Sequence, residues 1–183
     1  SRYRRELRER MQLPFTTVSP DVDEAPLIDE TPYALSLRLA EAKARAVAAL
    51  HPGALVIGSD QVPELDGQPL SKPGTHERAT EQLRPMSGTQ MNFHTGVCVI
   101  FQETGFIQVA VGTMNVRFRE LNDAEIERYL RAEQPYDCAG SAKSEGLGIA
   151  LLDALTSDDP TALVGLPLIR TCQMLRAAGV VLP

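Results

Sequence analysis

The feature that most constrains this chain is a short apolar run that ends in three polar residues. Residues 54–58, ALVIG, have the length and composition of a buried strand, and Ser59, Asp60 and Gln61 follow directly. Ligands of an α/β sheet collect at the carboxyl ends of its strands, where loops open a crevice. Two interpretations of Asp60 are therefore open: a functional carboxylate in such a crevice, or a short polar residue that closes the strand or begins a turn.

Capping signals predict four helices after residue 30. Thr31 followed by Pro32 is a typical helix start, and Asn122 with Glu125 three residues later forms a capping box. The residues that begin the four helices are Thr31, Thr75, Asn122 and Pro167. The expected ends are Pro52, Leu83, Ala132 and Gly179. In the first helix, apolar spacing of three and four residues predicts a packed face made of Leu35, Leu39, Ala42, Ala46 and Leu50. In the last, Ile169, Cys172 and Met174 or Leu175 are expected to pack inward.

Alternating segments predict antiparallel strands at residues 97–101, 106–111 and 114–118, with a turn at Thr104 and Gly105. A further short strand is predicted at 15–18. Together with the helix-strand unit around residue 54, this order indicates the α/β or α+β class. We expect one domain over residues 1–183, with a mixed, strongly twisted sheet flanked by helices.

Composition excludes several classes of protein. The net charge of −6 disfavours a broad nucleic-acid-binding face. No apolar run approaches the ~20 residues that span a bilayer, so no membrane partner is expected. The three cysteines, Cys98, Cys138 and Cys172, fit neither a disulfide framework nor a CxxC metal site. We therefore expect a cytoplasmic protein.

Cations and carboxylates in separate segments predict a site for phosphates and a metal. Arg4 and Arg5 lie in the first turn of a predicted basic helix, 1–11, where the helix dipole favours anions, so a bound anion would explain them. Lys72 and Lys143 lie in loops, and both could bind phosphate as point charges. Arg8 and Arg10 are assigned to a solvated face.

The acidic loop 19–30 is the candidate source of metal ligands. One or two of its carboxylates, Glu24 among them, could hold Mg²⁺ or Mn²⁺, although a purely solvated loop is the alternative. Phosphoryl chemistry needs positioning, charge stabilisation and a group that orients or deprotonates water, and Asp60 could be that group. Neither a Walker nor a Rossmann motif is present. The three histidines, His51, His76 and His94, are assigned structural or surface roles.

Seven short motifs occur in an order that resembles the Maf-like nucleotide pyrophosphatases. They are Ser1-Arg2-Tyr3-Arg4-Arg5, Asp23-Glu24, Gly58-Ser59-Asp60-Gln61-Val62, Lys72-Pro73, His94-Thr95-Gly96, Gly140-Ser141-Ala142-Lys143-Ser144-Glu145-Gly146 and Val164-Gly165-Leu166-Pro167. The resemblance covers nearly the whole chain and implies a Maf/ITPase-like fold. The family has a further strand and another serine before the first motif, so we expect residues to precede Ser1.

The resemblance implies hydrolysis of a nucleoside triphosphate between its α and β phosphates, with a divalent metal, Mg²⁺ or Mn²⁺. Asp60 is similar to the family's proton acceptor, and Glu24 with Asp60 would hold the metal. The residues implied to bind the triphosphate are Ser1, Arg4, Arg5, Lys72 and Lys143. A homodimer is also implied.

Two positions resemble the branch that acts on 7-methyl-GTP, and a third departs from it. Gln61 and Glu145 match that branch, and Tyr3 stands where it usually has Trp. A carboxylate can accept from N1–H and the exocyclic amine of guanine, and an aromatic face attracts the cationic methylated base. The alternatives are a dTTP/UTP pyrophosphatase of the same family, a non-catalytic nucleotide-binding regulator of cell division, and a phosphate-binding domain without a catalytic role.

Overall fold

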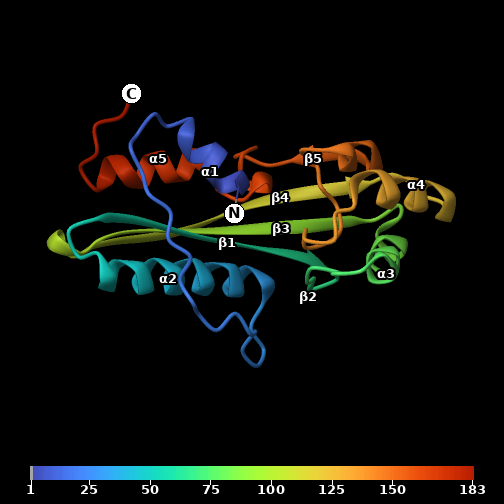
Figure 1. Cartoon of the computed structure of the whole chain (residues 1–183), viewed down its shortest axis with the longest axis horizontal. Coiled ribbons are helices and arrows are strands. Elements are labelled where there is room, and N and C mark those ends of the chain that lie inside the picture. The colour runs from blue at the N-terminus through green and yellow to red at the C-terminus, as the bar shows by residue number, and fades with distance from the viewer. Residues whose placement is uncertain (1) are drawn as a thin grey trace.

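The computed structural model describes residues 2–183, apart from the side chains of Arg2, Tyr3 and Leu7. Its helices are α1 (Arg2–Glu9), α2 (Pro32–Leu50), α3 (His76–Met86), α4 (Asp123–Glu133) and α5 (Leu168–Ala177). Its strands are β1 (Leu55–Leu65), β2 (Gln68–Pro69), β3 (Gln90–Phe101), β4 (Phe106–Phe118) and β5 (Leu152–Thr156). The strands form one sheet in the order β2-β1-β3-β4-β5. Helix α2 covers one face, α1 and α5 lie over the other, and α3 and α4 lie at one end (Figure 1). The predicted class, a sheet flanked by helices, is confirmed.

Strand pairing corrects two expectations. All four pairings among the described residues are antiparallel, so the sheet is not mixed. Strand β1 also continues well beyond residue 58, because Ser59, Asp60 and Gln61 pair with Val97, Gly96 and Thr95 of β3. Asp60 therefore lies in the middle of a long strand, where side chains alternate between the two faces of the sheet. It neither ends the strand nor begins a turn.

Three of the four helix starts predicted after residue 30 are confirmed by capping contacts, and α5 begins directly after Pro167 without one. The hydroxyl of Thr31 accepts the N–H of Ala34, and that of Thr75 accepts the N–H of Arg78. Asn122 and Glu125 form the complete capping box. Helix α3 is longer than predicted, since Pro85 lies inside its last turn. The predicted strand at 15–18 is wrong, and β5 was not predicted.

Helix α2 packs closely against β1 and β3 because two strand positions have no side chain. A Cβ atom on Gly58 would lie 2.3 Å from the Ala40 carbonyl oxygen, and one on Gly96 would lie 2.2 Å from that of Ser36. The helix side that meets these strands is therefore lined by Ser36, Ala40, Ala44 and Ala48, all buried. The predicted face is thus right for Leu35 and Leu39, which are buried, and wrong for Ala42 and Ala46, which are half-buried, and for Leu50, which is exposed.

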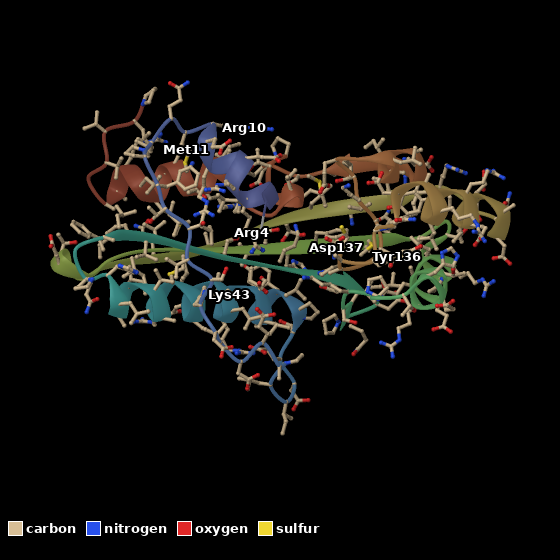
Figure 2. All side chains as sticks on the ribbon, in the orientation of Figure 1. Arg4, Arg10, Met11, Lys43, Tyr136 and Asp137 are labelled. Carbon is tan, nitrogen blue, oxygen red and sulfur yellow. The ribbon has the colours of Figure 1, made fainter. Side chains whose placement is uncertain are left out.

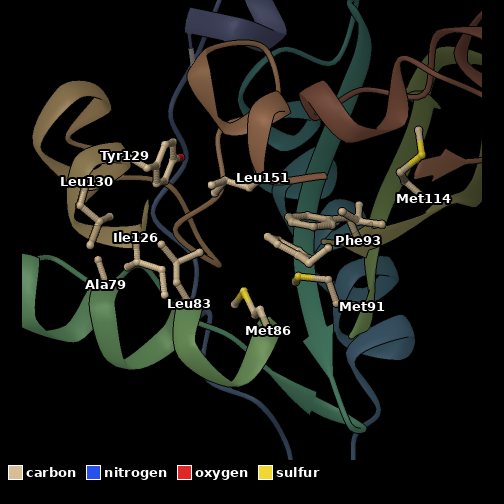
Figure 3. Packing of buried hydrophobic residues seen from close by; sticks show 12 residues of the cluster. Ala79, Leu83, Met86, Met91, Phe93, Met114, Ile126, Tyr129, Leu130 and Leu151 are labelled. Carbon is tan, nitrogen blue, oxygen red and sulfur yellow. The ribbon is translucent and has the colours of Figure 1, made fainter. Parts of the chain in front are cut away.

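The largest buried apolar cluster lies at the end of the sheet that α3 and α4 cover (Figure 3). Leu83 and Met86 of α3 meet Ile126 and Leu130 of α4 there, against Met91 of β3. A second cluster joins the sheet face opposite α2 to α5. There, Met174 and Leu175 are buried as predicted, whereas Ile169 is exposed. Among the described residues, no helix has the length and apolar character needed to cross a membrane.

Candidate active site

A cavity of about 1290 Å³ opens along the edge of β1. The edge is accessible because β2 pairs with β1 only at Glu64 and Leu65. Side chains from both faces of the sheet therefore reach one space. Among the predicted site residues that the structure describes, six line it: Arg4, Glu24, Asp60, Gln61, Lys72 and Glu145.

Lys43 of α2 joins the two predicted metal ligands. Its Nζ lies 2.6 Å from Asp60 Oδ1 and 2.6 Å from Glu24 Oε1. The side chains of Lys43 and Asp60 are only 15% and 13% exposed, whereas that of Glu24 is 62% exposed. Within the described part of the chain, the Asp60 carboxylate forms no other hydrogen bond or ion pair. The ammonium thus holds two carboxylates together at the cavity edge.

Lys43 was not among the residues predicted from the sequence, although a signal was present. Lys43 follows Leu35 and Leu39 at intervals of four residues, so it occupies a position on the apolar side of α2. A cation within such a stripe is rarely buried without a partner. The position alone therefore predicts a buried carboxylate nearby, which the structure identifies as Asp60.

Helix α1 brings further cations to the opposite side of the cavity. Figure 2 shows Arg4 on α1 and Lys43 on α2, which come from opposite faces of the sheet. Arg4 Nε donates to the Gly165 carbonyl at 2.8 Å. Burial lowers the pKa of the Arg4 guanidinium, and the charges of Asp60 and Glu24 oppose this shift. Arg4 is therefore a half-buried cation that interacts electrostatically with both predicted metal ligands.

Arg8 also lines the cavity, which corrects its assignment to a solvated face. Its guanidinium lies over the Phe15 ring, 5.0 Å from the centroid. Burial lowers the pKa of Arg8, and the positive charges of Arg4 and Arg5 lower it further. Cations that repel one another at close range in this way fit a site that binds a polyanion. Arg10 is exposed, as expected.

On the other face of β1, neutral side chains hold a short 3-10 turn, η3 (Ala162–Val164). Ser59 Oγ lies 2.8 Å from the Gly96 carbonyl oxygen and 3.0 Å from that of Gly165. The amide nitrogen of Gln61 lies within 3.0 Å of Thr95 Oγ1 and of the carbonyl oxygens of residues 162 and 163. Thr95, fully buried, donates to the same Ala162 carbonyl. Gln61 therefore lines the cavity while its amide group fixes the η3 wall.

A glycine-containing segment, residues 137–145, forms another wall. Glu145 and Ser144 line the cavity, and so do Asp137 and Cys138. Burial, and then the Asp137 carboxylate, raise the pKa of the Cys138 thiol to about 12. A thiol that stays protonated at neutral pH is not a nucleophile. The chemistry of the cavity therefore belongs to its carboxylates and cations.

The sequence pattern of the family described as "Maf-like protein" matches residues 1–178, almost the whole chain. The chain belongs to the Maf-like family. A relative from Polaromonas sp. strain JS666 named 7-methyl-GTP pyrophosphatase is 64% identical over 182 residues, which are 100% of this chain and 83% of the relative. Proteins of the same name from Albidiferax ferrireducens and Burkholderia thailandensis are each 62% identical over 98% of this chain. The matched segments make up 90% and 85% of those two relatives, respectively.

In this Maf-like chain, the remaining predicted phosphate ligands differ in whether they line the cavity. Lys72 is exposed and lines the cavity beside Pro73. Arg5 is exposed and is not among the lining residues, and the Lys143 ammonium binds Glu133 Oε1 at 2.5 Å. Ser1 and the Tyr3 side chain lie outside the described part of the structure.

The histidines have the structural or surface positions that were expected. His94 is buried between Glu64 and Thr113, and its ring meets that of Tyr33 edge-on. His76 bonds to Glu127 and Tyr136. His51 is exposed at the end of α2.

The carboxylates of this Maf-like site fit a hard divalent metal. Among the described residues, no group of three or more His, Cys, Asp or Glu side chains could hold a metal ion by itself. Glu24 and Asp60 nevertheless converge on one cation, the Lys43 ammonium. Mg²⁺ is usually bound in this manner, by one or two carboxylates, waters and the phosphates of a substrate.

Proposed function

We propose that this protein is a nucleoside triphosphate pyrophosphatase that converts 7-methyl-GTP, or a closely related modified nucleotide, to the monophosphate and pyrophosphate. One observation supports this most: Asp60, paired with Lys43, stands in a large cavity whose other side is formed by the cations Arg4 and Arg8. The names of the relatives, at 62–64% identity, support the choice of substrate.

The reaction follows from the roles of the carboxylate and the cations. In the proposed mechanism, the oxygen of a water molecule attacks the α phosphorus while Asp60 accepts a proton from that water. The bond between the α phosphorus and the bridging oxygen breaks, and pyrophosphate leaves with the electron pair. Lys43, bound to Asp60 Oδ1, orients the carboxylate. Glu24 and Asp60 would hold Mg²⁺ or Mn²⁺, which neutralises phosphate charge when bound.

The cations that line the cavity are the proposed phosphate ligands. Arg4 is already oriented by its bond to the Gly165 carbonyl, and Lys72 lines the same cavity. A guanidinium binds phosphate oxygens in pairs, whereas an ammonium acts as a point charge. Ser1, Arg5 and Lys143 stay predictions from the family resemblance.

The base is proposed to contact Glu145 and Tyr3. The Glu145 carboxylate can accept from N1–H and the exocyclic amine of guanine, which uracil and thymine cannot supply. Tyr3 would stack on the cationic methylated ring. Gln61 contributes to selectivity through the η3 wall, since its amide nitrogen binds that wall.

The test is pyrophosphate release with Mg²⁺ from 7-methyl-GTP, GTP, dTTP and UTP under identical conditions. Turnover of 7-methyl-GTP well above that of dTTP and UTP is expected. Higher turnover of the two pyrimidine nucleotides would support the proposed mechanism but identify dTTP and UTP, and not 7-methyl-GTP, as the substrates. Binding of all four nucleotides without pyrophosphate release would refute the proposed enzymatic activity and support a nucleotide-binding regulator.

A further inference from the structure

Glu133, the last residue of α4, lies behind the 137–145 wall and binds it from outside the cavity. One carboxylate oxygen accepts from Lys143 Nζ at 2.5 Å, and the other accepts the N–H of Leu147 at 2.7 Å. The side chains of Glu133 and Lys143 are 14% and 22% exposed, so water screens this pair only in part. One carboxylate thus joins both ends of the stretch 143–147, in which Glu145 is the central residue.

The position of Glu133 is costly for the helix itself. The last turn of a helix ends in carbonyl groups that favour cations, so a carboxylate there is unfavourable by itself. The hydrogen bond from Lys143, followed by that from Leu147, lowers the pKa of Glu133 despite this location. The acid at this helix end is therefore explained by what it binds across the wall.

The local backbone is built around the carboxylate. A Cβ atom at Gly146 would lie 2.7 Å from Glu133 Oε2 and 2.8 Å from Oε1, so a glycine permits the carboxylate to rest against the main chain. Tyr129, one turn earlier on α4, adds a second attachment. Its hydroxyl accepts the N–H of Lys143 and donates to the Ser141 carbonyl, each at 3.0 Å.

We infer that Glu133 is a positioning residue for base selection: acting through Lys143 and the Leu147 amide, it fixes where Glu145 stands in the cavity. The inference rests on the proposed function, in which Glu145 contacts the base. It gives Lys143 a role in holding the wall, in place of direct contact with the phosphates. Lys143 is absent from the cavity lining, whereas its neighbours Ala142 and Ser144 belong to it.

The first test is Glu133→Gln, which keeps an acceptor for Leu147 and removes the charge that binds Lys143. We expect KM for 7-methyl-GTP to rise about tenfold, because charged hydrogen bonds are about twice as strong as neutral ones. kcat is expected to change far less. Inorganic triphosphate, which has the phosphates without a base, should inhibit wild type and variant equally. The matched control is Glu127→Gln on the same helix, whose carboxylate binds His76 and Arg131.

A double-mutant cycle separates the two roles of Lys143. If Lys143 acts only with Glu133, the variants Glu133→Gln, Lys143→Met and their combination should show the same rise in KM. If Lys143 binds phosphate directly, Lys143→Met should also weaken inhibition by inorganic triphosphate, and the losses should not coincide. The second result would overturn the inference while leaving the pyrophosphatase proposal intact.

Hydrogen exchange tests the positioning without any turnover. Peptides that span residues 140–148 should exchange faster in Glu133→Gln than in wild type or Glu127→Gln. Unchanged exchange there would refute the inference whichever nucleotide proves to be the substrate, and failure of the wild type to release pyrophosphate would refute only the proposed function. If Glu133→Gln does not fold, Glu133→Asp replaces it, because the shorter side chain cannot reach both partners; normal exchange in that variant would equally refute the inference.

Discussion

The two faces of β1 at the cavity differ in chemistry although they are formed by adjacent residues. Toward α2, Asp60 takes part in a charged group with Lys43 and Glu24. Toward η3, Ser59 and Gln61 make only neutral hydrogen bonds, largely to backbone carbonyls. One residue of strand register separates these two environments.

The difference indicates a division between reactivity and shape. Charged groups near solvent can exchange partners when a substrate arrives, whereas buried neutral bonds are costly to break and hold a fixed geometry. We therefore expect substitutions on the α2 face to reduce turnover at nearly constant stability. Substitutions on the η3 face should reduce stability with less effect on turnover.

The largest effect is expected for Asp60→Asn. An amide cannot accept the proton from water, so kcat should fall about 10³-fold, within the range for loss of a general base. The amide keeps an oxygen for Lys43, so the unfolding midpoint should stay close to that of wild type. Asp66→Asn, in the exposed turn after β1, is the matched control. Full activity of Asp60→Asn would show that another group activates the water.

Lys43→Met should have the next largest effect. The variant leaves Asp60 and Glu24 close together without their shared cation, and kcat/KM should fall roughly ten- to hundredfold, as for loss of a charged hydrogen bond. Steady-state kinetics with 7-methyl-GTP as the substrate measure this change in kcat/KM. Arg45→Met, at an exposed position of the same helix, should behave as wild type. Equal activities of the two variants would remove Lys43 from the mechanism.

Local sequence signals predicted the helices well and the site in part. Thr31, Thr75 and Asn122 cap helices through bonds to residues three positions away, so a short window contains the whole signal. The extension of β1 through Asp60 depends on pairing with β3, more than 30 residues later, and polar residues in mid-strand look like a strand end.

The same reason explains what was missed on both faces. The partner of Lys43 lies 17 residues away, and the partners of Gln61 in η3 lie 101 and 102 residues away. The carboxylates and cations of the site could be proposed from residue type alone. Their division between the two faces could not, because it follows from strand register.

The smallest effect is expected for Thr95→Val on the η3 face. Valine has nearly the same shape but cannot donate to the Ala162 carbonyl, so the free energy of unfolding should fall by about 1–2 kcal/mol. Turnover should stay near wild type. Chemical denaturation measures the change, with Thr104→Val at an exposed turn as the control. A large loss of kcat at unchanged stability would contradict the division between the faces.

The two glycines under α2 have a consequence for how this protein tolerates change. At Gly58 and Gly96 the helix rests on bare backbone, so the separation between Lys43 and Asp60 is set by main-chain contact and not by the volume of any side chain. Substitution of the side chains that α3 and α4 bury against each other, such as Leu83 and Ile126, would then alter the melting temperature while leaving the ion pair in place. The distance between these two charged groups is therefore expected to withstand changes of apolar volume elsewhere in the protein.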